Sequence, residues 1–241
     1  MKIKLACLIM VIGYSIIVPE TALAFKVDKM VVVSDEKGNG AISLSNDGSA
    51  PLFIQSNIQE LTVNQNNEVV RNDYTRKNLS DWKISLTHPQ VVLRPGEEKT
   101  VGIRSLCYES SCDTTTDLMF MLPFTPSHYD AKSIKSSGIQ FNYGFTPIYI
   151  IPTRSPNVEY KVLNNGADLI IENKGNTLIY VTVEGEGCGE LKQCRSEYMV
   201  ISGRSKVFNL PENVQSENLN ITVSSHDKQY NKTSVYHRSK N

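Results

Sequence analysis

Short runs of alternating hydrophobic and polar residues make up most of the chain after residue 25, and no segment shows convincing helical spacing. Alternation over about four to eight residues, with many β-branched side chains, is typical of strands that have one face in a core. Clusters of Gly, Asn, Asp and Pro separate the runs and favour turns. We therefore predict strands at 26–34, 41–45, 52–62, 90–93, 99–106, 118–123 and 139–151.

A segment with two prolines at 152–157 interrupts this pattern, as a linker would. A second set of predicted strands follows at 158–163, 168–172, 177–183, 197–207 and 218–224. The polar residues 226–241 have little to bury, and we expect them to fray. Short strands at this spacing are typical of antiparallel sandwiches. We predict an all-β chain with two immunoglobulin-like β-sandwich domains, at residues 25–152 and 153–241.

The first 24 residues have the order of a secretory signal peptide. Lys2 and Lys4 precede an apolar run at 5–18, and small residues follow up to Ala24. This order predicts a signal peptide that is cleaved after Ala24. The run is too short for a transmembrane helix, and no second run of comparable length follows. We therefore expect an exported protein that does not insert into a membrane.

Composition and motif content exclude several classes of function. The 25 basic and 25 acidic residues cancel, so no overall charge favours nucleic acid. The four histidines (His88, His128, His226 and His237) show no metal-ligand spacing. No nucleophile elbow, phosphate-binding glycine loop or zinc-protease motif is present in the sequence. We expect neither an enzyme nor a cofactor.

Four cysteines remain in the exported chain after Cys7 is removed with the signal peptide: Cys107, Cys112, Cys188 and Cys194. An even number in an oxidising compartment is typical of disulfides. Three pairings are open, and proximity favours 107–112 with 188–194. The alternative is a metal site, although these spacings differ from those of zinc knuckles.

Four motifs occur in an order that resembles periplasmic pilus chaperones of the chaperone–usher pathway. The turn and strand at 89–104 is similar to the proline-glycine hairpin of that family, which leads into a strand ending in an apolar residue and an arginine. The segments 42–46 and 50–56 resemble its second strand, asparagine-containing turn and third strand. The segment 169–183 and the turn at 202–205 resemble the corresponding hairpin of its second domain. The second-domain cysteine pair resembles a divergent, alternate branch.

The resemblance implies an L-shaped periplasmic chaperone. It would bind pilus or fimbrial subunits by donor-strand complementation and deliver them to an outer-membrane usher, without a cofactor. Clients of this family lack their last strand and expose unpaired strand edges, which are templates for aggregation. A chaperone strand lent to such an edge supplies main-chain hydrogen bonds and a row of side chains. The free chain could self-associate through the same strand.

The best candidate for the donated strand is the segment 139–145. Alternation places one row of apolar side chains on a single face, while the intervening side chains face the other way. The row consists of Ile139, Phe141, Tyr143 and Phe145. The alternative is that this row faces the protein's own core.

Basic residues are the candidates for anchoring a client carboxylate. Common family members place one basic residue near the start of the first strand and another near the end of the last strand of domain one. The second position falls near Pro147 or Ile148, where no basic residue occurs. Lys29, Arg104 and Arg154 are the substitutes that we predict. The alternative is that they are ordinary solvated cations.

The alternative hypothesis from the sequence is a secreted immunoglobulin-like adhesion or receptor module. Three sequons, at Asn78, Asn220 and Asn231, fit glycosylation in such a protein. Neither half shows the Cys, Trp and Cys order of antibody-type domains, which counts against it.

Overall fold

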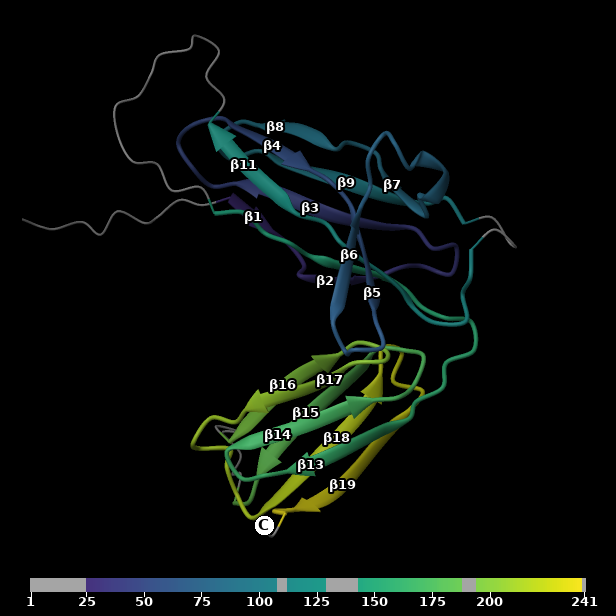
Figure 1. Cartoon of the computed structure of the whole chain (residues 1–241). Helices are drawn as coiled ribbons and strands as arrows, with labels where there is room; N and C mark the ends of the chain where they lie inside the picture. The colour runs from purple at the N-terminus through teal and green to yellow at the C-terminus, as the bar shows by residue number, and fades with distance from the viewer. Residues whose placement is uncertain (1–24, 108–111, 129–142, 188–193, 240–241) are drawn as a thin grey trace, which may run out of the picture.

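The computed structural model describes residues 25–107, 112–128, 143–187 and 194–239. Strands dominate these residues, and the only helical element among them is a single 3-10 turn, η1 (Leu79–Asp81). The strands form two sandwiches that meet at one end and diverge, so that together they have the shape of an L (Figure 1). The predicted all-β class with two immunoglobulin-like sandwiches is confirmed.

One layer of the first sandwich is a four-stranded sheet, and the other layer is divided into two sheets. The four-stranded sheet has the order β1 (Phe25–Val27), β3 (Gly40–Asn46), β9 (Glu98–Ser105) and β7 (Ile84–Leu86). The five-stranded sheet has the order β2 (Val31–Val33), β12 (Ile148–Ile151), β10 (Leu118–Met121), β5 (Gln59–Val63) and β6 (Val69–Asp73). The three-stranded sheet has the order β11 (Phe124–His128), β4 (Leu52–Ser56) and β8 (Gln90–Leu93).

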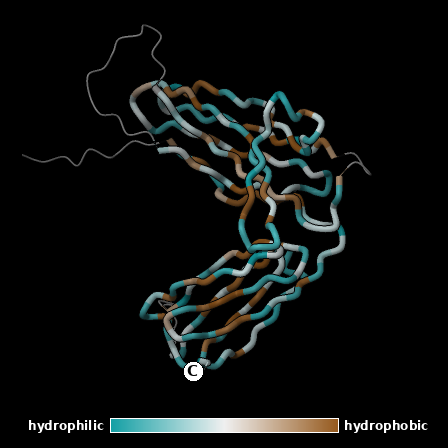
Figure 2. The backbone as a smooth tube through the Cα atoms, in the orientation of Figure 1, coloured by the Kyte–Doolittle hydropathy of each residue, from teal (hydrophilic) through white to brown (hydrophobic). Residues whose placement is uncertain are grey.

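The second sandwich packs a three-stranded sheet on a four-stranded one. The first has the order β13 (Tyr160–Asn164), β14 (Asp168–Asn173) and β17 (Ser205–Asn209). The second has the order β16 (Arg195–Val200), β15 (Ile179–Gly185), β18 (Asn218–Ser225) and β19 (Asn231–His237). Along many strands of both sandwiches, hydrophobic and hydrophilic residues alternate (Figure 2), as strands with one buried face require.

A buried asparagine ends one strand in each sandwich and ties its two layers together. At the end of β3, Asn46 donates through Nδ2 to the carbonyls of Ala50, at 2.9 Å, and Leu93, at 3.1 Å. At the end of β14, Asn173 donates in the same way to Thr177 and Val200, at 2.8 and 3.0 Å. Both asparagines lie in turns on which the family resemblance rests, and their burial gives those turns a structural reason.

The prediction that the C-terminal tail frays is wrong. Residues 231–237 form β19, which pairs with β18 along its whole length. Its side chains are mostly exposed, so the hydrophobic pattern that marks a strand is missing. Main-chain hydrogen bonds to β18 hold this edge strand in place, and such bonds leave no trace in side-chain composition.

Three predicted strands are each divided into two in the structure. The segment 26–34 forms β1 and β2, which belong to different sheets. The segment 52–62 forms β4 and β5, which belong to different sheets because the chain changes direction at Asn57 and Ile58. The segment 197–207 forms β16 and β17, with a turn at Gly203 whose φ of 71° favours glycine. Besides β19, three strands were not predicted: β6, which is mostly exposed, the three-residue β7, and β11, which begins directly after the predicted segment 118–123.

Among the described residues, no helix is long and apolar enough to span a bilayer. The same residues contain no group of three or more His, Cys, Asp or Glu side chains that could hold a metal ion. Cys107 and Cys112 form the predicted disulfide. Cys194 is also disulfide-bonded, while Cys188 lies outside the described residues.

Candidate functional site

The predicted donor segment joins the first sandwich on the side of β11 that faces away from β4, called the free side here because no described strand pairs with it. On its other side, β11 pairs with β4 over its whole length. On the free side, Phe124 donates its N–H to the carbonyl of Phe145 at 2.7 Å, and Phe145 donates back at 3.1 Å. Within the described part of the chain, which leaves out residues 129–142, this contact is a single antiparallel bridge. The bridge fixes Phe145, the last of the predicted donor residues, against Phe124 of β11.

Gly144 makes this close approach possible. A Cβ atom at this position would lie 2.8 Å from the carbonyl oxygen of Phe124. Backbone cannot move aside as a flexible side chain can, so any larger residue would push the segment off β11. We conclude that glycine is required here by the proximity of two backbones.

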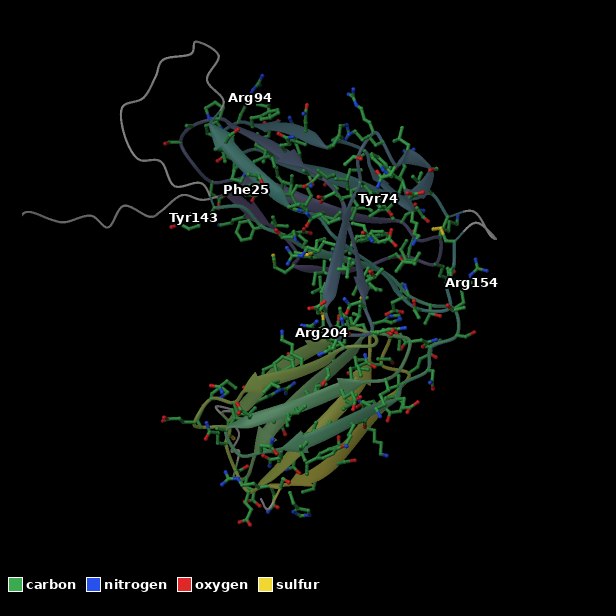
Figure 3. All side chains as sticks on the ribbon, in the orientation of Figure 1. Phe25, Tyr74, Arg94, Tyr143, Arg154 and Arg204 are labelled. Atoms are coloured by element: carbon green, nitrogen blue, oxygen red, sulfur yellow. A yellow bond between two sulfur atoms is a disulfide. The ribbon has the colours of Figure 1, made fainter. Side chains whose placement is uncertain are left out.

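Tyr143 and Phe145, the two predicted donor residues that are described, have opposite environments. The Phe145 ring packs against the core of the first sandwich, with its centroid 5.6 Å from that of Phe25. Tyr143 is 77% exposed, more than any other large hydrophobic side chain that the structure describes (Figure 3). Ile139 and Phe141 lie outside the described residues. Phe145 therefore packs on its own sandwich, whereas the Tyr143 side chain is exposed.

The register of β11 leaves backbone groups facing this free side. Because the N–H and C=O groups of Phe124 both bond to Phe145, those of Pro126 and His128 point the same way. Pro126 carries no N–H, which is common on an edge strand. The carbonyl of Pro126 and both groups of His128 are therefore directed at the side on which the predicted strand would lie.

The three predicted anchor cations lie on separate elements, and the structure does not bring them together. Lys29 is exposed just before β2, with its Nζ 4.0 Å from Asp28. Arg104 is exposed on β9, between inward-facing neighbours, in the layer opposite to the one that faces the second sandwich. Arg154 is exposed in the connection between the sandwiches, where it lines a pocket of about 560 Å³.

An apolar face that the sequence-based search did not include points into the angle of the L. On the five-stranded sheet, Leu61, Met119 and Ile150 pack against Leu178 of the second sandwich. Around this cluster lie partly buried apolar side chains: Val31, Val69, Met121 and Ile148 from the first sandwich, and Tyr180, Met199 and Ile201 from the second. Arg71, which is exposed, pairs directly with Leu61 and so shares this face.

The proline-glycine turn between β8 and β9 has the geometry that its sequence predicts. Gly96 has a φ of 72°, which only glycine adopts without strain. The Arg94 N–H donates to the Glu97 carboxylate at 2.7 Å. This hydrogen bond, followed by that from Lys99, lowers the pKa of Glu97 below its ordinary value. The turn is exposed at the end of the first sandwich that is remote from the second (Figure 3).

A family model described as the CS5 fimbrial protein N-terminal domain matches residues 27–152. The matched region is more than half of the chain and coincides with the first sandwich. The chain belongs to the CS5 fimbrial protein family. A comparison with curated protein sequences finds no match.

Solved structures of fimbrial chaperones share the fold along nearly the whole chain. The Salmonella enterica SafA pilin in complex with the SafB chaperone matches with a TM-score of 0.56 at 12% identity, over 91% of this chain and 98% of that one. The CsuC–CsuE chaperone–tip adhesion subunit complex of Acinetobacter baumannii gives 0.55 at 12%, over 90% and 100%. The class 5 fimbriae chaperone CfaA gives 0.54 at 12%, over 89% and 100%. At these identities the likeness shows the fold.

A signal for the missed apolar face is present in the sequence. The runs 118–122 and 148–151 are apolar at every position, whereas a strand with one solvent-facing side alternates. In β12, Tyr149 faces the sandwich core, and the next residue, Ile150, faces the second sandwich. Continuous apolar runs of this kind predict that both faces of the sheet are covered.

Proposed function

We propose that this chain is a periplasmic chaperone that binds pilus or fimbrial subunits by strand donation and delivers them to an outer-membrane usher. The observation that carries the proposal is the family match over residues 27–152. The fold supports it, because the similar solved structures are fimbrial chaperones, two of them in complex with a pilin or a tip adhesion subunit. The activity needs no cofactor and no catalytic residue.

The donated strand in this proposal is the segment 139–145, held to the first sandwich at its C-terminal end. Phe145 and Gly144 fix the segment against β11. Ile139, Phe141 and Tyr143 would then enter the groove of a subunit. Burial of each large apolar side chain contributes about 1.5–3 kcal/mol, or roughly 5–9 kcal/mol for three. Association costs several kcal/mol, so the complex would be reversible, as delivery to an usher requires.

The domain limits and the export signal belong to the same proposal. Residues 1–24 would be removed as a signal peptide, and residues 25–152 and 153–241 would form the two domains. The last strand of the first sandwich ends at Ile151, and the first strand of the second begins at Tyr160, which supports a boundary in this connection.

The client carboxylate would meet a cation near the angle of the L. Lys29 and Arg71 belong to the five-stranded sheet or its border, whose apolar face turns toward that angle. Arg104 lies in the other layer, and Arg154 lies in the connection. The variants Lys29→Ala, Arg71→Ala, Arg104→Ala and Arg154→Ala, compared for client affinity, identify which of the four serves as the anchor.

Periplasmic co-purification tests the proposed function. Tagged mature chain is expressed with the open reading frames that flank its gene, and the eluate is weighed by native mass spectrometry. We expect a one-to-one complex with a small β-rich subunit. Phe141→Asp and Tyr143→Asp should abolish it, whereas Val207→Asp, at a 58% exposed position on β17, should not.

Three other outcomes would overturn parts of the proposal. Recovery of the tagged chain without any partner would favour the alternative hypothesis of a secreted adhesion or receptor module. A dimer of the chain without a subunit would show that the strand serves self-association. Complex formation by both aspartate variants at the wild-type level would show that the segment 139–145 is not the donor.

A further inference from the structure

A buried carboxylate lies at the point where the two sandwiches join. Asp117 immediately precedes β10 and is 4% exposed. One carboxylate oxygen accepts the Thr153 N–H at 2.9 Å. The other accepts the Leu178 N–H at 2.7 Å and the Thr177 hydroxyl at 3.1 Å.

The three donors come from different parts of the chain. Thr153 follows the last strand of the first sandwich, while Thr177 and Leu178 lead into β15 of the second. The Asp117 N–H adds a fourth bond, to the carbonyl of Asn176 at 3.0 Å. A single side chain of the first sandwich therefore holds both the connection and the second sandwich.

No ion pair among the described residues involves Asp117, so its direct partners there are the hydrogen-bond donors named above. A buried charge is costly unless its hydrogen-bonding capacity is met. Hydrogen bonds to an ionised group are also stronger and more sensitive to geometry than neutral ones. A change in the angle between the sandwiches would stretch the hydrogen bonds that Thr177 and Leu178 donate to Asp117. The buried charge would then lack part of its hydrogen bonding, which is energetically costly.

A second anchor lies at the tip of the β5–β6 hairpin, which extends from the first sandwich to the second (Figure 1). The Asn67 side chain donates to the carbonyl of Ser205 at 2.8 Å and accepts its N–H at 2.7 Å. Arg204 also donates to the carbonyl of Asn67. Asn67 has a φ of 64°, a region that asparagine tolerates better than most residues. In this conformation the side-chain amide of Asn67 reaches Ser205 at the edge strand β17.

We propose that Asp117 is the positioning residue that fixes the angle between the two sandwiches, with Asn67 as the second anchor. The two anchors grip different segments of the second sandwich, around residues 177–178 and 204–205. The apolar cluster of Leu61, Met119, Ile150 and Leu178 adds a third contact across the junction. Rotation about any one contact is opposed by the others. This inference concerns the free chain and holds whether or not the proposed function does.

Residual dipolar couplings of the free mature chain test the inference, because they report the orientation of each sandwich in solution. For the wild type we expect one alignment tensor for both sandwiches. For Asp117→Asn we expect two tensors of different magnitude or orientation. The NH2 group of the new asparagine would face at least one of the three N–H or O–H donors, so that hydrogen bond would be lost. Asp113→Asn is the matched control: Asp113 is exposed and, among the residues that the structure describes, accepts from Thr115 alone, at 2.9 and 2.7 Å.

Two further variants keep the test decisive if Asp117→Asn does not fold. Thr177→Val removes one donor and keeps the carboxylate and the side-chain shape, and Asn67→Ala removes the second anchor. Each variant should make the alignment tensors of the two sandwiches differ, but by less than Asp117→Asn does. The variant that carries both Thr177→Val and Asn67→Ala should make them differ by more than either substitution alone. The inference is overturned if Asp117→Asn folds with a single wild-type tensor. It is equally overturned if Asp117→Asn fails to fold and both other variants keep that tensor.

Discussion

Replacement of Asn46 by alanine tests whether a buried amide holds the first sandwich together. Asn46 is fully buried at the end of β3. Its Nδ2 donates to the carbonyls of Ala50 and Leu93, and its Oδ1 accepts the Gly48 N–H at 2.9 Å. Leu93 ends β8 in the opposite layer, so this hydrogen bond links the two layers at the end of the sandwich. Asn46→Ala removes all three bonds and leaves the three backbone groups without these partners.

The magnitude follows from how far water can reach each group. The bond to Leu93 is buried, and loss of such a partner costs about 1–3 kcal/mol. The bonds to Ala50 and Gly48 are partly buried, so water restores some of the interaction, and each loss costs about 0.5–1.5 kcal/mol. We therefore expect Asn46→Ala to lower the free energy of unfolding by about 2–6 kcal/mol, against a total of about 5–15 kcal/mol for a typical domain.

Tryptophan fluorescence during urea denaturation measures this loss. Trp82, the one tryptophan in the sequence, packs against the first core and stacks on Tyr74 with centroids 5.4 Å apart. Its emission therefore reports the unfolding of the first sandwich. Asn72→Ala is the control, because Asn72 is exposed on the edge strand β6. The reasoning is refuted if Asn46→Ala lowers stability by less than about 1 kcal/mol, the net value of one ordinary hydrogen bond.

Three other perturbations have outcomes that the structure predicts. Tyr149→Phe removes a buried hydrogen bond of 2.6 Å from the hydroxyl to the carbonyl of Gly38, and we expect a loss of about 1–3 kcal/mol in chemical denaturation. Burial raises the pKa of Tyr74 and Tyr149 above the ordinary value of 10.0. The stability that the two neutral phenols contribute is therefore complete below pH 10 and is lost as the pH rises further. The melting temperature as a function of pH measures the loss of stability, and tyrosinate absorbance measures the ionisation. Gly144→Val places a side chain against the carbonyl of Phe124, and hydrogen exchange should show faster exchange at the bridge that follows.

Each of these outcomes has a control within the same chain. Tyr143→Phe removes an exposed hydroxyl and should leave stability unchanged, and an equal loss would contradict the argument for Tyr149. The alkaline prediction fails if stability is constant up to pH 12. In Gly144→Val, the Ile148 amide, bonded to Met30 at 2.9 Å, should keep its protection. Unchanged exchange at Phe145 would show that Gly144 is not needed for the bridge.

The sequence predicted what depends on local pattern. Alternating residues such as Ile42 and Leu44 identified strands because their side chains enter a core that any sandwich must have. The turn at Gly96 was predictable because its conformation favours one residue type. The pair Cys107 and Cys112 was predictable because the two residues are close in sequence. None of these features requires knowledge of distant contacts.

Features set by distant contacts were not predicted. Strand β19 is polar on its exposed side and depends on hydrogen bonds to β18. Asp117 and Thr177 lie 60 residues apart, and nothing in either local sequence indicates that they meet. The placement of Arg104 in the layer remote from the second sandwich follows from sheet order, which alternation alone does not determine. In each case the missing information is which segments become neighbours.

The junction and the proposed donor edge lie on one stretch of chain, which explains how the angle of the L and the edge can share a fixed geometry. From Asp117 the chain runs through β10, past Leu122 and Pro123, and into β11. Alternate side chains along this stretch, Leu118, Phe120, Leu122 and Phe124, are buried in the first core. The inward alternation continues across the break between the two sheets, and proline restricts the backbone there. A tilt of β10 relative to β11 would therefore pull large side chains out of a close-packed core. The Asp117 carboxylate, which bonds to the second sandwich, and the Phe124 backbone, which bonds to Phe145, therefore lie at the two ends of a single restrained segment.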